Sequence, residues 1–318
     1  MSATNHAHNS QHNGTATEPE ADSKLMDIRA MQPRAIEAAK WRTYCQREGI
    51  PLGPSTGFKA IDEMLDGYMA PGMHILHGSP GVGKSALALA MAVECGCPAI
   101  YVSAELHAEV ILCRLMARAL QTPMGIVRRY SEWETYQASE KVINKYPLFT
   151  MLDASYAGAD IGRLKRAIDT VKHSHPQRSK SGVLIVVDSV HTWAQRQYSD
   201  RQEYDRLNYA LSHLEVLAQA SRCPILAIAE RNRASKDDTG VSSAKGSSRF
   251  EYAGESVMAL DEVRTGDLPP GQPPQYCTPV TLTVSKNRFG TKGRIHLTWH
   301  GATQTHKLAD DLDPEGKF

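Results

Sequence analysis

The chain has 318 residues, of which 41% are hydrophobic and 22% charged, a composition that allows one large α/β domain with extensions or two smaller domains. Its 36 Lys and Arg residues against 35 Asp and Glu residues give a net charge of +1, which excludes a globally basic surface for nucleic acid but not a local basic patch. The sequence has no apolar run of about 18 residues and no secretory signal pattern, and its six cysteines are too sparse for a disulfide scaffold, so we expect a cytoplasmic protein with reduced thiols and no membrane span.

The N-terminal region divides into a polar segment and a helical segment. Residues 1–24 are rich in Ser, Thr, Asn and His and nearly lack apolar side chains, so we predict a disordered tail that cannot offset its ordering entropy. Residues 25–48 carry apolar residues at roughly helical spacing, with Pro33 either kinking one helix or opening a second. Gly49 and Pro51 stop this pattern. We therefore predict a linker helix over residues 25–50.

Residues 51–308 alternate short apolar runs with helical patterns, which is typical of an α/β domain. Five runs are predicted to be strands: His74–His77, Ala99–Ser103, Leu148–Leu152, Val183–Val187 and Pro224–Ala229. The fourth run contains only Val, Leu and Ile, as expected of a strand covered on both faces. Apolar residues recur at helical spacing over 161–171 and 207–217. The pattern predicts a mostly parallel central sheet flanked by helices.

A β pattern follows toward the end of the chain. Three further strands are predicted: Ser256–Leu260, Val280–Val284 and Arg294–Trp299. The last two flank a turn-like segment over 288–293 and are predicted to form a C-terminal β-hairpin. Residues 267–275 are predicted to be a surface loop, and residues 309–318 a C-terminal tail.

One segment matches the phosphate-binding pattern G-x-x-x-x-G-K-[ST] in full, between an apolar strand and a helix. The segment is Gly78-Ser79-Pro80-Gly81-Val82-Gly83-Lys84-Ser85. Its glycines allow backbone N–H groups to surround phosphate oxygens, and the following helix directs its positive end toward them. Lys84 adds a charge for the β- and γ-phosphates, and the Ser85 hydroxyl is a ligand for Mg²⁺. The segment therefore predicts an ATP site with Mg²⁺.

Two carboxylates are candidates for the metal and for water activation. Asp188 ends an apolar strand, where it would hold Mg²⁺ together with Ser85 at the carboxyl edge of the sheet. Glu105 follows the strand Ala99–Ser103, where it would reach the attacking water. By position alone, Glu105 is equally well explained as an ordinary glutamate at a helix start.

These motifs together resemble the ATPase domain of DnaB-type replicative helicases, within the RecA-like P-loop class. The resemblance extends from about Leu52 to Leu308 and is carried by the stretch beginning Ser55-Thr-Gly-Phe, the P-loop, Ser103-Ala-Glu-Leu, Arg114-Leu-Met-Ala, Asp188, Pro224-Ile-Leu-Ala-Ile-Ala-Glu-Arg-Asn-Arg and Lys286-Asn-Arg-Phe-Gly. Tyr101-Val-Ser and Asp188-Ser-Val-His-Thr are closer to the RadA/Sms branch. The fold implied is a RecA-like P-loop NTPase core.

The resemblance assigns roles to several of these positions. It makes Glu105 the catalytic glutamate, and it makes Lys286 and Arg288 a pair that reaches the γ-phosphate of a neighbouring subunit in a homo-oligomer, which in this family is a ring hexamer. Without the resemblance, these two residues would be solvated charges beside a turn. Glu230 occupies the position where the family often has a glutamine that senses the γ-phosphate, and a carboxylate there would repel phosphate unless it pairs with a cation such as Arg231 or Arg233.

Residues 231–249 form a Ser/Gly-rich stretch with local positive charge. Its candidate DNA-binding residues are Arg231, Arg233, Lys236, Lys245, Ser247 and Arg249. Small polar residues with cations suit contact with a nucleic-acid backbone, and the family's loop here lines the channel for single-stranded DNA. The alternative is a solvated surface loop.

We therefore expect an ATP-dependent helicase or translocase acting on single-stranded DNA in replication or repair. Two alternatives stay open. One is a RadA-like recombination ATPase, which has similar chemistry. The other is a nucleotide-switched regulatory or binding protein without motor activity, an interpretation that Glu230 keeps open.

Overall fold

The computed structural model describes residues 27–156, 159–230, 247–263 and 277–309. The chain divides into two compact units, residues 1–48 and residues 49–318. The tail expected over 1–24, the loop expected over 267–275 and residues 310–318 of the C-terminal tail lie outside the described residues. None of the helices within the described ranges is long and apolar enough to cross a membrane.

The first unit contains helix α1, Ile28–Glu48. Asp27 caps its start, since its carboxylate accepts the backbone N–H of Ala30 at 2.8 Å. Pro33 lies inside α1, so the second helix considered from the sequence does not form. The helix ends before Gly49, whose φ of 65° lies in the left-handed region where glycine commonly terminates helices.

The second unit is built on a nine-stranded sheet of order β3-β2-β4-β5-β1-β6-β7-β8-β9. The strands are β1 (Gly72–Gly78), β2 (Ala99–Ser103), β3 (Phe149–Asp153), β4 (Leu184–Asp188), β5 (Pro224–Glu230), β6 (Gly254–Glu262), β7 (Cys277–Asn287), β8 (Gly293–His300) and β9 (Thr305–Leu308). The first six run parallel, and β7, β8 and β9 continue the sheet in antiparallel fashion. The expected α/β fold, with its parallel sheet and its hairpin of β7 and β8, is confirmed.

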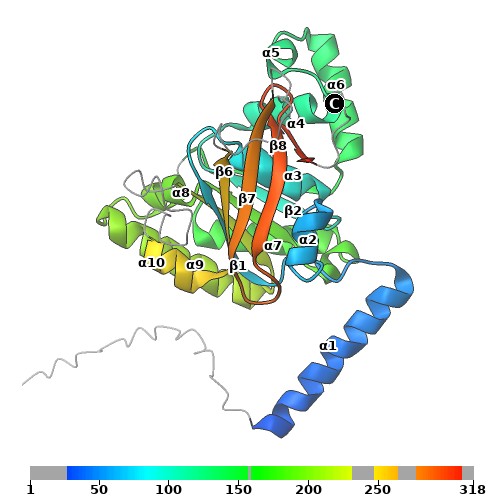
Figure 1. Ribbon diagram of the computed structural model, residues 1–318, viewed down its shortest axis with the longest axis vertical. Coiled ribbons are helices and arrows are strands. Elements are labelled where there is room, and N and C mark those ends of the chain that lie inside the picture. The colour runs from blue at the N-terminus through cyan, green and yellow to red at the C-terminus, as the bar shows by residue number, and fades with distance from the viewer. Residues whose placement is uncertain (1–26, 157–158, 231–246, 264–276, 310–318) are drawn as a thin grey trace, which may run out of the picture. The chain divides into compact units, whose positions relative to one another are not determined.

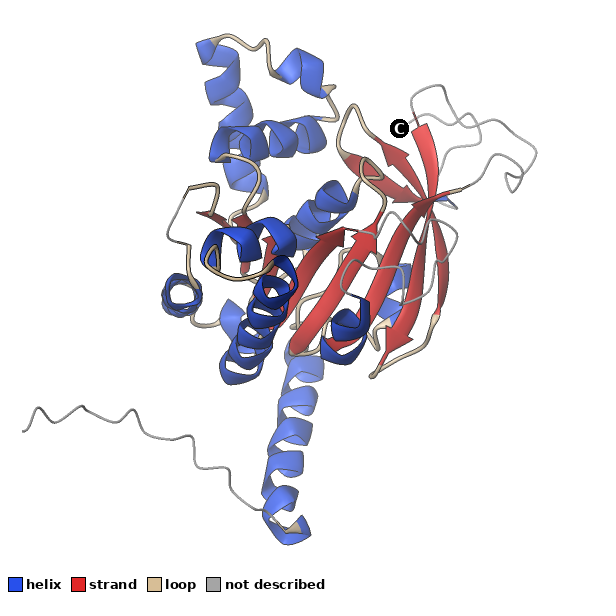
Figure 2. Ribbon diagram, turned by 90° about the vertical axis from the view of Figure 1, so that its left-hand side faces the viewer, coloured by secondary structure: helices blue, strands red, loops and turns tan. Residues whose placement is uncertain are grey.

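The described residues form ten α-helices, of which nine belong to the second unit together with the sheet (Figures 1 and 2). Besides α1 they are α2 (Lys59–Met64), α3 (Lys84–Glu94), α4 (Ala108–Leu120), α5 (Met124–Val127), α6 (Glu132–Lys145), α7 (Ile161–Ser174), α8 (Val190–Gln197), α9 (Glu203–Ser221) and α10 (Ser247–Ala253). A short 3-10 helix spans Arg178–Ser181. Helices α2, α4, α5, α6, α8 and α10 and strand β9 were not predicted from the sequence.

Alternation along the buried strands separates two cores. In β4, Leu184 and Val186 join the core beneath α3, α4 and α6, whereas Ile185 and Val187 join the core beneath α7, α8 and α9. All four side chains are fully buried. Each such side chain contributes about 1.5–3 kcal/mol through burial, so the sheet is held from both faces. The carboxyl edge of its parallel strands is thereby fixed as a rigid base for the loops that follow β1, β2 and β4.

Candidate functional site

The P-loop connects the buried strand β1 to α3 and is packed closely against the neighbouring strands. A Cβ atom on Gly78 would lie 2.1 Å from the carbonyl oxygen of Leu260 in β6, so only glycine fits there. Gly83 has a φ of 94°, and a Cβ atom on it would lie 2.9 Å from both His306 of β9 and Trp299 of β8. The rings of Trp299 and His306 stack with centroids 4.4 Å apart. Side chains of β8 and β9 thus pack directly against the end of the P-loop.

Lys84 is the first residue of α3, and the loop backbone holds its side chain. Its Nζ atom donates hydrogen bonds to the carbonyl oxygens of Gly78, at 3.0 Å, and Ser79, at 2.8 Å. Gly81 has a φ of 83°, and nothing lies within 4 Å of the position its Cβ would take. The loop therefore presents a cation, an open backbone turn and the N-terminus of a buried helix at one place, which suits a bound phosphate group.

Asp188 is the last residue of β4 and is buried at the carboxyl edge of the sheet. Tyr101 of β2 donates its hydroxyl to Asp188 Oδ2 at 2.5 Å. Burial raises the pKa of the Asp188 carboxyl above its usual value, while hydrogen bonds from Tyr101 and Ser85 oppose this rise. Burial and the charge of Asp188 raise the pKa of Tyr101 well above its usual value, so the phenol stays a donor. Arg114 of α4 also stabilises the carboxylate by its charge.

Glu105 lies beyond the carboxyl end of β2, close to the residues that follow Asp188. The two strands are in register, with Ser103 of β2 opposite Asp188 of β4. Glu105 Oε1 accepts the hydroxyl of Ser189 at 2.6 Å and the hydroxyl of Thr192 at 2.9 Å. Glu105 itself is exposed. The structure thus brings an exposed carboxylate, a buried carboxylate and the P-loop to the same edge of the sheet.

The donor set at this edge fits Mg²⁺ bound to nucleotide phosphates. Ser85 lies close enough to Asp188 to lower the pKa of its carboxyl, so both side chains can approach one ion. Hydroxyl and carboxylate oxygens are the ligands that Mg²⁺ takes in such sites, with phosphate oxygens and water completing the octahedron. Lys84 and the loop N–H groups supply the positive environment that the phosphates need.

Arg288 lies at the opposite edge of the parallel strands from the P-loop, and Lys286 lies two residues before it on β7. Lys286 pairs with Val257 in β6, three residues before Leu260, which pairs with Gly78 of the P-loop. The backbone N–H of Arg288 donates to the backbone oxygen of Glu255 at 2.9 Å, and its Nη1 lies 3.1 Å from the Glu255 carboxylate. The structure therefore does not bring this pair to the nucleotide site of its own chain.

The turn that carries Arg288 is anchored to α2. Asn287 Nδ2 donates to the carbonyl oxygens of Met64, at 2.7 Å, and Thr291, at 3.0 Å. A Cβ on Gly290 would lie 1.9 Å from the same Met64 oxygen, so glycine is needed for this close approach. The Arg288 side chain remains 52% exposed on this fixed turn, which leaves it accessible to a second molecule.

Glu230, at the end of β5, lies opposite Gly78 in the register of the sheet. Its backbone N–H approaches His191 Nδ1 at 3.5 Å, and its side chain is exposed. Four of the expected DNA-binding residues, namely Arg231, Arg233, Lys236 and Lys245, and the side chain of Ser247 lie outside the described residues. Arg249 is held by α9, because its Nη2 donates to Ser212 at 2.7 Å and lies 3.3 Å from a Glu215 carboxylate oxygen. In this structure Arg249 anchors α10 to α9.

Sequence reasoning missed four side chains of the site: Tyr101, Arg114, Ser189 and Thr192. All four stand within or next to the motifs that carry the family resemblance, which was the one signal that could have drawn attention to them. Their roles depend on the pairing of β2 with β4, which no local pattern specifies.

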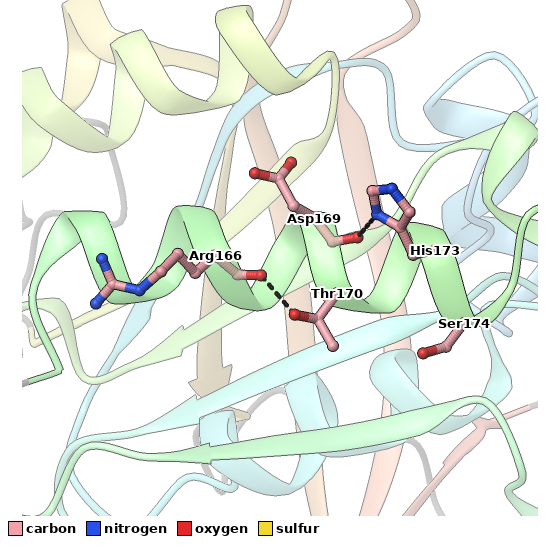
Figure 3. Close-up of a pocket in the computed structure, with 5 residues that line it drawn as sticks. All are labelled: Arg166, Asp169, Thr170, His173 and Ser174. Atoms are coloured by element: carbon pink, nitrogen blue, oxygen red, sulfur yellow. Dashed lines mark hydrogen bonds between the residues drawn. The ribbon is translucent and has the colours of Figure 1, made fainter.

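An open hollow on α7 is separate from this site (Figure 3). It is lined by Arg166, Asp169, Thr170, His173 and Ser174. The Thr170 hydroxyl donates to the backbone oxygen of Arg166 at 2.9 Å, and His173 Nδ1 bonds the backbone oxygen of Asp169 at 2.6 Å. These polar groups are satisfied by their own helix and do not converge on a ligand position.

The comparison with protein families matches residues 53–307 to the DnaB-like helicase C terminal domain. Curated relatives include the replicative DNA helicase DnaB of Leifsonia xyli subsp. xyli (strain CTCB07), which is 24% identical over 289 residues, covering 84% of this chain and 57% of the relative. The replicative DNA helicase DnaB of Pasteurella multocida (strain Pm70) is 23% identical over 304 residues, covering 90% and 62%. The chain thus spans about three fifths of the length of these relatives.

Solved structures share the fold. A solved ATPase domain has a TM-score of 0.69 at 15% identity, covering 89% of this chain and 99% of that domain. A DnaB-like replicative helicase studied with its interactions with primase has a TM-score of 0.68 at 16% identity, covering 89% and 67%. A KaiC-like protein from the archaeon Pyrococcus horikoshii has a TM-score of 0.54 at 15% identity, covering 80% and 97%.

Proposed function

Because the chain belongs to the DnaB-like helicase C-terminal domain family, we propose that it is an ATPase that acts as a helicase or translocase on single-stranded DNA. The observation that carries this proposal is the grouping of the P-loop, Asp188 and Glu105 at one edge of the sheet, while Arg288 is exposed at the opposite edge. The first three supply one side of a phosphoryl-transfer site, and the last suits completion of a neighbour's site.

In the proposed reaction, Lys84 and the P-loop N–H groups bind the β- and γ-phosphates. Ser85 and Asp188 would hold Mg²⁺, which when bound neutralises charge on the phosphate oxygens. Glu105 accepts a proton from the attacking water as the water oxygen bonds to the γ-phosphorus. The bond to the β–γ bridging oxygen breaks, giving ADP and inorganic phosphate.

The site would be completed between subunits. Arg288 and Lys286 lie too far along the strands to serve the P-loop of their own chain, as the register of β6 with β1 and β7 indicates. A ring in which each subunit offers this edge to the P-loop edge of the next would give every nucleotide a cation in trans. The family resemblance supports a hexamer, and α1 would dock on the adjacent subunit as a linker helix.

The DNA contact is assigned to the segment that follows β5. Residues 231–246 contain the cations Arg231, Arg233, Lys236 and Lys245. Without aromatic side chains before residue 250, this segment would grip phosphates rather than stack bases, so binding would be tolerant of sequence and sensitive to salt. Glu230 joins this segment to the strand beside the P-loop, which is the route by which nucleotide state would reach the DNA. The proposal includes a cytoplasmic location and a role in replication or repair.

Glu230 also supports a second candidate, a nucleotide switch without motor activity, because its carboxylate replaces the expected amide beside the phosphate site. Measuring ATP turnover with and without single-stranded DNA at two salt concentrations separates the two. A motor predicts strong stimulation that weakens as salt rises. Turnover that is indifferent to DNA would favour the switch and would refute the motor. A RadA-like ATPase would be distinguished by preferring branched DNA to a simple forked duplex.

A further inference from the structure

The first turn of α8 directs two hydroxyl groups at one oxygen of Glu105. Ser189 precedes the helix and caps it, since its Oγ accepts the backbone N–H of Thr192 at 3.4 Å. A hydroxyl has a single hydrogen to donate, and the shortest contact of Ser189 Oγ is the one to Glu105 Oε1, at 2.6 Å. Thr192, one turn along, donates to the same oxygen at 2.9 Å. Two hydrogen bonds from one rigid turn therefore fix the carboxylate.

The two oxygens of the Glu105 carboxylate are used differently. Oε1 receives both hydroxyls, whereas Oε2 has no hydrogen bond among the residues that the structure describes. An exposed glutamate side chain would otherwise sample several rotamers, and most of these would carry its oxygens away from an attacking water. Holding Oε1 leaves Oε2 as the oxygen available to take a proton.

From this geometry we propose that Ser189 and Thr192 are positioning residues for Glu105, an inference that rests on the proposed ATPase function. They act through the carboxylate and do not touch the nucleotide. Misplacing a reacting group by about 1 Å costs up to about 100-fold in rate. Losing one of the two donors should therefore lower kcat while leaving the affinity for ATP to the P-loop residues.

The same turn is connected to the strand that leads to the proposed DNA segment. His191 lies between Ser189 and Thr192, and its Nδ1 faces the backbone N–H of Glu230 at 3.5 Å. Its ring also contacts Phe250 of α10, with centroids 5.9 Å apart. Glu230 and Phe250 flank the proposed DNA segment in the sequence. A displacement of either contact on DNA binding would shift the α8 turn and, with it, the orientation of Glu105, so the proposal includes a response of this positioning to DNA.

Steady-state ATP turnover of Thr192→Val, Thr192→Ser and Thr170→Val in the full chain tests the proposal. Valine keeps the shape of threonine and removes the hydroxyl, whereas serine keeps the hydroxyl. Thr170 is the matched control, because its hydroxyl bonds only its own helix on α7. We expect Thr192→Val to lower kcat by about 10- to 100-fold with KM for ATP within about twofold. Thr192→Ser and Thr170→Val should stay within about threefold of the wild-type kcat.

A normal kcat in Thr192→Val would overturn the positioning role, and so would an equal loss in Thr192→Ser. A rise in KM equal to the fall in kcat/KM would assign Thr192 to nucleotide binding instead and would also contradict the proposal. A wild-type chain without ATP turnover would refute the proposed function itself. If the positioning of Glu105 responds to DNA through His191, then His191→Ala should reduce the ratio of DNA-stimulated to unstimulated turnover. An unchanged ratio would contradict this connection.

Discussion

Removing the Tyr101 hydroxyl should show how much this group stabilises the buried Asp188 carboxylate. Tyr101 has no exposed surface, and its hydroxyl lies 2.5 Å from Asp188 Oδ2. In Tyr101→Phe the ring still fills its place beside Phe149, but the carboxylate loses a donor in a position where water has little room to replace it. The change therefore isolates one charge-assisted hydrogen bond.

The magnitude follows from the charge and the burial of Asp188, which is 5% exposed. A hydrogen bond to a buried ionised group contributes about 1.5–3 kcal/mol, so we expect Tyr101→Phe to lower the free energy of unfolding by about 2 kcal/mol at pH 8. Burial already raises the pKa of Asp188, and removing the donor raises it further. As the pH falls through that raised pKa, the carboxyl becomes neutral, and the difference between the two proteins should shrink to about 1 kcal/mol or less.

Urea unfolding of both proteins between pH 8 and pH 4 measures this difference. Tyr136→Phe on α6 is the matched control, because its side chain is 56% exposed, and its unfolding free energy should change by less than about 0.5 kcal/mol. A loss of less than about 0.5 kcal/mol in Tyr101→Phe at pH 8 would refute the reasoning. A difference that grows as the pH falls would refute the assignment to an ionised Asp188.

Three further results are expected. Arg288→Ala should lower ATP turnover about 1000-fold without weakening ATP binding. Arg294 is an exposed arginine of β8, and the control variant Arg294→Ala should leave turnover unchanged. Normal turnover in Arg288→Ala would exclude the trans role. Burial, with the charge of Arg118, lowers the pKa of His306 from 6.5 to about 3. Between these pH values the unfolded chain binds a proton at His306 and the folded chain does not, so the free energy of unfolding should fall as the pH drops from 6.5 toward 3. Thermal melts across this range should show a flatter decline for His306→Phe, and an identical decline would contradict that assignment. Deleting residues 1–50 should weaken the ring in light scattering, and an unchanged assembly state would remove the docking role of α1.

The parts of the fold that sequence reasoning anticipated are those specified by local pattern. The P-loop needs glycines at fixed offsets between a strand and a helix, and the all-aliphatic run before Asp188 is buried on both faces as expected. These elements owe their structure to residues near in sequence. The observed bounds of β3 and β4 differ from the predicted bounds by one residue at each end.

The unanticipated parts depend on distant pairings or on ambiguous patterns. Strand β9 is only four residues long, is largely polar and owes its existence to pairing with β8. Helix α6 exposes Trp133, Tyr136 and Ile143, so its apolar residues do not mark a buried face. Ser189 and Thr192, whose hydroxyls hold Glu105, follow β4, whereas Glu105 follows β2. Only the pairing of these two strands brings the three residues together, so the sequence pattern did not indicate Ser189 and Thr192.

A mixing experiment tests most directly whether the ATP site is shared between subunits. Lys84→Ala chains keep Arg288, and Arg288→Ala chains keep the P-loop, so each alone should be nearly inactive. Co-expressed with two different affinity tags and purified through both, the mixed assembly should recover turnover at the interfaces that join an intact loop to an intact arginine, about a quarter of them for random mixing. Turnover no higher than that of either variant alone would contradict a site completed in trans.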